Sequence, residues 1–158
     1  MNRNRLIPRL HAFAGILAFA IIAAFLIASA AVELGGTRQA VASVKTTVAW
    51  ALTILVPALM ATGLTGFLMA GARPRGRAGI KLARMRVVAA NGLLVLVPSA
   101  IFLALKAGAG EFDAIFATVQ GVEFFAGGVN LVLMGLNIRD GLAITDRLGR
   151  SHSARCVG

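Results

Sequence analysis

The stretch that decides the fold is residues 114–138, AIFATVQGVEFFAGGVNLVLMGLNI, in which Glu123 is the single charged residue. Its length and apolar character are those of a membrane-crossing helix, which needs about 20 mostly apolar residues. Polar and small side chains recur in it three or four residues apart, at Gln120, Glu123, Gly127, Asn130, Met134 and Asn137. That spacing puts them on one helix face. We therefore predict a polar intramembrane stripe of Gln120, Glu123, Asn130 and Asn137 that faces neighbouring helices.

Three further stretches have the same apolar character, and together they predict spans at about residues 10–32, 46–71, 87–105 and 114–138. Long continuous apolar runs favour helices over the alternating strands of a barrel, because lipid offers the backbone no hydrogen-bond partners. The short connections after the first and third spans predict antiparallel neighbours. The expected fold is an all-α, polytopic bundle of four transmembrane helices over residues 1–142, followed by a flexible basic cytoplasmic tail over residues 143–158.

The overall composition excludes the soluble classes of protein. Of the 158 residues, 58% are apolar and 14% are charged, whereas a soluble domain usually has about 25% charged residues. The mean hydropathy is +0.84, which is more apolar surface than one small core hides from water. One Trp and no Tyr make a nucleic-acid partner a poor fit despite the basic charge, and the lone Cys156 excludes an internal disulfide.

The basic residues are distributed unevenly around these spans. Three precede the first span, six lie between the second and third, and four follow the fourth, whereas the other two connections hold only three. Because basic residues concentrate in cytoplasmic loops, this distribution predicts that both termini and the middle connection are cytoplasmic. Ala28-Ser29-Ala30 also resembles a signal-peptide cleavage site, but the apolar run exceeds the usual 7–15 residues, so we expect a retained first span.

Small residues and prolines mark expected features of the other spans. Ala20, Ala24 and Ala28 form a ladder at helical spacing, which we expect to be a close-packing seam. Pro57 and Pro98 lie near the middles of spans two and three, where each is expected to bend its helix.

Glu123 is the first candidate for a functional residue, because an ionisable group within a span is costly and is by default a hypothesis of function. One interpretation is a buried carboxyl, bonded to Thr47 or to another helix, that keeps the helices in register. The other is a site that handles protons or cations.

A second candidate site lies toward the cytoplasmic ends of the spans, where all four helices contribute groups at similar depth. Its members are His11, Thr62, Thr65, Asn91, Asn130, Met134 and Asn137. Such a cluster fits a haem b or a quinone as cofactor, with His11 as an axial ligand or hydrogen-bond partner. A haem needs a second axial ligand, for which His11 of a second subunit, Met69 or Met134 are available. No spacing indicates catalytic residues or a metal site.

Several segments resemble small four-helix membrane proteins of proteobacteria that carry no assigned activity. These segments are Leu10–Gly15, Ala90–Pro98, Gly110–Asp113 and Met134–Gly141. The resemblance implies a bacterial inner-membrane location. Glu123 with Gly127 and Gly135 also resembles, over one helix, the pattern of four-helix DoxX-type proteins.

Three functional hypotheses follow. The first is a non-catalytic subunit, assembly factor or scaffold of a membrane complex, whose partners are the lipid bilayer and either further copies of the chain or another membrane protein. The second is a small redox-linked membrane protein that binds haem or quinone. The third is a minimal oligomeric transporter or proton pathway that uses Glu123.

Overall fold

The structure, a computed structural model, describes the backbone of residues 3–70 and 77–155 and the side chains of residues 6–69 and 79–142. Its helices are α1 (Arg3–Gly35), α2 (Arg38–Ala70), α3 (Arg77–Asn91), α4 (Val97–Gly108) and α5 (Ala114–Arg155). A π-helical segment, η1 (Gly92–Leu96), joins α3 to α4 without a break. Within the described residues every element is helical, and four helices are long and apolar enough to cross a membrane. The all-α prediction with four potential spans is confirmed.

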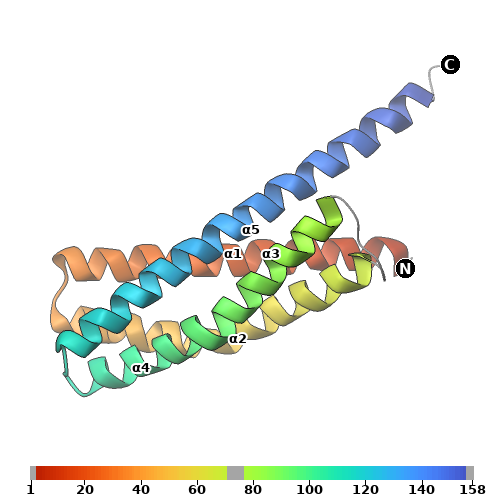
Figure 1. Ribbon diagram of the computed structural model, residues 1–158. Coiled ribbons are helices and arrows are strands. Elements are labelled where there is room, and N and C mark those ends of the chain that lie inside the picture. The colour runs from red at the N-terminus through yellow and green to blue at the C-terminus, as the bar shows by residue number, and fades with distance from the viewer. Residues whose placement is uncertain (1–2, 71–76, 156–158) are drawn as a thin grey trace.

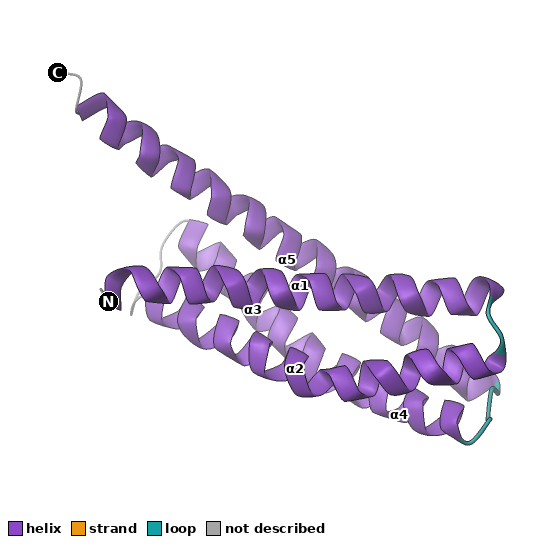
Figure 2. Cartoon of the chain, turned by 180° about the vertical axis from the view of Figure 1, so that it is seen from behind, coloured by secondary structure: helices purple, strands orange, loops and turns teal. Residues whose placement is uncertain are grey.

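The two short connections, residues 36–37 and 109–113, lie at one end of the bundle, which we call the loop end (Figure 1). The N-terminus lies at the opposite end, which we call the terminal end, and α5 leaves the other helices as it continues past that end (Figure 2). α1 packs along α2, and α5 contacts α1, α3 and α4. Side chains from all four spans therefore meet inside the bundle.

Each helix is longer than the apolar run that predicted it. α2, for example, begins at Arg38 rather than near residue 46, and the backbone of α5 stays helical to Arg155, through the segment expected to be a flexible tail. Backbone hydrogen bonds do not depend on side-chain polarity, so a helix extends beyond its apolar run until residues that favour a turn end it. Gly110, with φ of +74°, adopts a left-handed conformation that favours glycine, and it separates α4 from α5.

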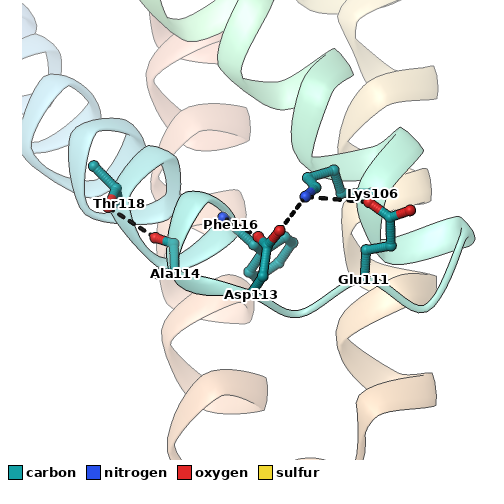
Figure 3. A network of polar contacts seen from close by, with 6 residues as sticks. All are labelled: Lys106, Glu111, Asp113, Ala114, Phe116 and Thr118. Atoms are coloured by element: carbon teal, nitrogen blue, oxygen red, sulfur yellow. Dashed lines mark hydrogen bonds and ion pairs between the residues drawn. The ribbon is translucent and has the colours of Figure 1, made fainter.

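Asp113 sets the beginning of α5. Its Oδ1 accepts a hydrogen bond of 2.9 Å from the Phe116 N–H, which is the usual pattern of an N-terminal helix cap. The Lys106 ammonium lies 2.6 Å from Asp113 Oδ2 and 3.1 Å from Glu111 Oε2 (Figure 3). These contacts tie the last turn of α4 to the first turn of α5 at the loop end.

The small residues that α1 buries are not those that the sequence indicated. Ala14 and Ala18 are buried, whereas Ala20 and Ala24 are exposed, so the Ala20–Ala24–Ala28 ladder does not pack inside this bundle and stays a predicted seam for contact with another chain. α1 is apolar on every side, so the spacing of its alanines does not reveal which face meets α2. Ala18 packs with Ile22, Leu55 and Met134 in the larger core cluster.

The prolines differ in what surrounds them. α2 continues as one helix through Pro57. Pro98 is the second residue of α4, one residue beyond the junction with η1, where the Val97 N–H bonds to the Gly92 carbonyl oxygen, one residue further back than in an α-helix. Pro98 has no N–H to donate to the carbonyl four residues back, so the α-helical hydrogen-bond pattern is interrupted there and the helix widens locally.

Candidate ligand-binding site

The polar stripe of α5 is buried along its whole length. Its four members are exposed by 9% or less: Gln120 by 5%, Glu123 by 9%, Asn130 by 0% and Asn137 by 8%. They divide into three neighbourhoods along the helix, at the loop end, in the middle and toward the terminal end.

At the loop end lies an ion-pair cluster of Ser29, Lys45, Gln120 and Glu123. The Lys45 ammonium donates to Glu123 Oε2 at 2.6 Å and to Ser29 Oγ at 3.2 Å. Gln120 Nε2 donates to the same Glu123 oxygen at 3.2 Å, while Gln120 Oε1 is buried without a partner among the described residues. Lys45 is completely buried. The cluster joins α1, α2 and α5 through one charged contact.

Of the two partners predicted for Glu123, Thr47 or another helix, the structure shows the second, because Lys45 lies on α2. Thr47 is exposed and donates to the Ser43 carbonyl oxygen, so it does not reach Glu123. Lys45, which was placed in the connection before the second span, lies inside α2. A hollow of about 50 Å³ adjoins Glu123 and is lined mainly by apolar side chains.

In the middle of the bundle, two asparagines pair with each other. Asn91 Nδ2 donates to Asn130 Oδ1 and to the Ala126 carbonyl oxygen, both at 2.8 Å. Asn130 Nδ2 lies 3.4 Å from the Val88 carbonyl oxygen. The pair fastens α3 to α5 immediately before η1, and neither asparagine lines the larger cavity described below.

His11 is oriented by α2. Its Nδ1 lies 3.1 Å from the Thr62 carbonyl oxygen and 3.1 Å from Thr65 Oγ1. The Thr65 hydroxyl hydrogen is directed to the Ala61 carbonyl oxygen, so both atoms facing Nδ1 accept hydrogen bonds. Nδ1 therefore carries the proton, and in the neutral ring Nε2 is an acceptor. Nε2 has no hydrogen-bond partner among the described residues.

Beside His11 lies a cavity of about 280 Å³ between α1, α2, α3 and α5. Its walls are mostly apolar, and three methionines contribute to them, Met69, Met85 and Met134. Of the residues predicted as a ligand-binding cluster, the cavity brings together four: His11, Thr62, Met134 and Asn137. Thr65 contacts His11 and is not part of the lining, and Asn91 and Asn130 belong to the asparagine pair.

Besides His11 and Thr62, two polar side chains line this cavity, Asn137 and Lys81. Asn137 is 8% exposed, and its Oδ1 is buried without a hydrogen-bond partner among residues 6–69 and 79–142. Lys81, half-buried on α3, also lines it. The neighbouring Arg84 donates to Asp140 Oδ2 at 2.8 Å and joins α3 to α5 at the terminal end. Buried polar groups normally have partners, so the amide of Asn137 is unusual.

Neither Lys45 nor Lys81 was named as a candidate site residue from the sequence, because both lie just outside the predicted spans. A comparison of depths contains the signal for Lys45. It lies seven residues into α2 and Glu123 lies nine residues into α5, about 11 Å and 14 Å from the loop end at 1.5 Å per residue. For Lys81 no equivalent signal exists, because its role depends on a cavity that only the packing creates.

Comparisons with known proteins add no template for this site. No family model, curated protein or solved structure matches the chain.

Proposed function

We propose that this chain is a multi-pass protein of the bacterial inner membrane that binds a membrane-soluble quinone in the cavity beside His11. In this proposal the helices form an antiparallel bundle and both termini are cytoplasmic. The concentration of basic residues in the terminal segments and in the connection between spans two and three supports that orientation. The cavity then lies in the cytoplasmic half of the membrane.

The observation that carries the proposal is a mostly apolar cavity whose lining includes two side chains with hydrogen-bond donors, the Lys81 ammonium and the Asn137 amide. Ligand sites typically combine an apolar lining with a few polar groups that orient the ligand. A quinone carbonyl only accepts hydrogen bonds, so these two donors are the groups of the lining that suit it.

The size of the cavity favours a single substituted ring over a haem. Its volume of about 280 Å³ is roughly twice that of a 150 Å³ apolar cavity that holds benzene. Methionine sulfur makes favourable contacts with aromatic rings, and the lining contains Met69, Met85 and Met134. The rim includes exposed apolar residues such as Ile16 and Leu142, along which an isoprenoid tail reaches the lipid.

The other two hypotheses have less support. The subunit or scaffold hypothesis rests on the short loops, the absence of catalytic spacing and the small-residue seams, and a scaffold has no need of a cavity with polar groups on its wall. The transporter hypothesis requires a Glu123 carboxylate that is available to a cargo, whereas Lys45 and Gln120 already occupy one of its oxygens. A buried pair of this kind suits the role of holding helices in register.

The proposal is tested by filling the cavity. Gly63 lines it, and a Cβ at this position would meet no atom within 4 Å. We expect the side chain of Gly63→Leu to occupy part of this space and to abolish binding of decylubiquinone to the purified protein in lipid nanodiscs. Gly121→Leu is the matched control, because Gly121 is exposed on α5, also has open space and lines neither cavity. Equal binding by both variants would contradict the proposal.

A further inference from the structure

Gly66 on α2 lies behind two side chains of the cavity wall, those of Met85 and His11. A Cβ at this position would lie 2.5 Å from Met85 Cε, 3.0 Å from Met85 Sδ and 3.1 Å from His11 Cε1. Met85 and His11 line the cavity, whereas Gly66 is not part of its lining. Non-bonded carbon atoms are most stable about 3.5–4.0 Å apart, so any larger residue at this position displaces one of these neighbours.

Of the two neighbours, Met85 is the one that moves more easily. His11 is held on α2, because its Nδ1 lies 3.1 Å from the Thr62 carbonyl oxygen and 3.1 Å from Thr65 Oγ1. Methionine is unbranched and flexible, and it adapts readily to the space around it. The space beside Met85 is the cavity of about 280 Å³. A side chain added at Gly66 therefore pushes the Met85 thioether into the cavity.

We infer that Gly66 determines the specificity of the quinone site by keeping the Met85 thioether out of the cavity, which leaves room for a ring with bulky substituents; the inference rests on the proposed function. Gly66 does not touch the ligand and acts through Met85, so it is a positioning residue. Extra atoms in a filled site force side chains and ligand apart. A displaced thioether therefore penalises a ring with methoxy groups more than a smaller ring.

The experiment measures equilibrium binding of two quinones with the same decyl tail to the full chain in lipid nanodiscs. Decylubiquinone carries two methoxy groups on its ring, and decylplastoquinone carries methyl groups in their place. We expect Gly66→Ala to weaken the binding of decylubiquinone about ten-fold and that of decylplastoquinone by no more than about two-fold. The double variant Gly66→Ala with Met85→Ala removes the displaced thioether and is expected to regain most of the lost affinity for decylubiquinone.

Gly127→Ala is the matched control on α5. A Cβ at Gly127 would lie 2.9 Å from Leu26 Cδ1, so this substitution also displaces the end of a flexible apolar side chain. Gly127 and Leu26 line the small hollow beside Glu123, and neither lines the larger cavity. We expect Gly127→Ala to bind both quinones as the wild-type protein does. A loss of decylubiquinone binding equal to that of Gly66→Ala would overturn the inference, because the loss would then not depend on Met85.

The displacement of Met85 also has a readout that needs no ligand. In protein labelled with ¹³C at the methionine methyl groups, the Met85 resonance is assigned by its absence in Met85→Ala. We expect this resonance to shift in Gly66→Ala, because the methyl group leaves its place against the His11 ring, and to stay in place in Gly127→Ala. An unshifted resonance in Gly66→Ala would overturn the inference.

The remaining outcomes separate the inference from the proposed function. An unchanged ratio of the two affinities in Gly66→Ala, or a loss that Met85→Ala does not rescue, would overturn the role of Gly66 and leave quinone binding intact. Absence of binding of either quinone to the wild-type protein, or binding that Gly63→Leu leaves unchanged, would overturn the proposed function itself.

Discussion

The two polar sites on α5 differ in whether their buried groups have hydrogen-bond partners. At the loop end, Glu123 is bonded to Lys45 and Gln120, and Lys45 also reaches Ser29. Fourteen residues further along the same helix face, Asn137 lines a cavity with its oxygen unmet. Both regions are buried to a similar degree.

The contrast indicates a division of roles along one helix. A satisfied ion pair holds helices together, because breaking it leaves a charge in an apolar interior. An unsatisfied amide beside empty space stabilises nothing in the free protein, and it becomes useful only when a ligand supplies its partner. Stability and ligand binding are therefore expected to respond to different substitutions.

The largest effect is expected at the ion pair. Glu123→Leu leaves the completely buried Lys45 ammonium without its carboxylate, and we expect a loss of roughly 3–5 kcal/mol in the free energy of unfolding. The measurement is unfolding in mixed detergent micelles. The double variant Lys45→Met with Glu123→Leu removes both charges and is expected to regain most of the loss. A single variant as stable as the wild-type protein would show that the pair does not stabilise the bundle.

A matched pair of substitutions on α5 tests the comparison directly. Asn130 and Asn137 are both buried, but Asn130 bonds to Asn91 and lies near the Val88 carbonyl oxygen. Asn130→Leu is expected to cost roughly 1–3 kcal/mol. Asn137→Leu is expected to leave stability unchanged or to raise it by up to about 1 kcal/mol, since it removes an unmet acceptor. Equal losses in both variants, measured in the same micelles without added quinone, would remove the distinction between the sites.

The smallest effect is expected at the loop end, outside the spans. The hydrogen bond from Lys106, and then that from the Phe116 N–H, lower the pKa of Asp113 below its usual range. A lowered pKa in the folded state means that the stabilisation is complete above the unfolded pKa of about 3.9 and is lost as the pH falls through the folded value.

Asp113→Asn isolates this charge, because asparagine still caps a helix. We expect a slightly lower melting temperature than that of the wild-type protein at neutral pH. The difference should shrink as the pH is lowered below about 4. A difference that stays constant from pH 7 to pH 2 would show that the charge of Asp113 contributes nothing beyond the cap.

The residues differ in how far the sequence predicts their surroundings. The three- and four-residue spacing of Gln120, Glu123, Asn130 and Asn137 places them on one face, and the structure buries that face. The alanine spacing of α1 does not indicate which face the bundle buries, because a helix that is apolar all round has no preferred side. Lys45 and Lys81 looked like charges of the connections, because an apolar run marks where lipid begins and not where a helix begins.

By itself the sequence determined four apolar helices and the side of the last one that avoids lipid, because both properties follow from composition and from the 3.6-residue period. Only the tertiary structure decided which of those polar groups find partners. Lys45 and Glu123 are 78 residues apart, and their contact depends on how far each helix is shifted and rotated against the next. The same packing leaves Asn137 facing a cavity, a property that no local pattern along the chain encodes.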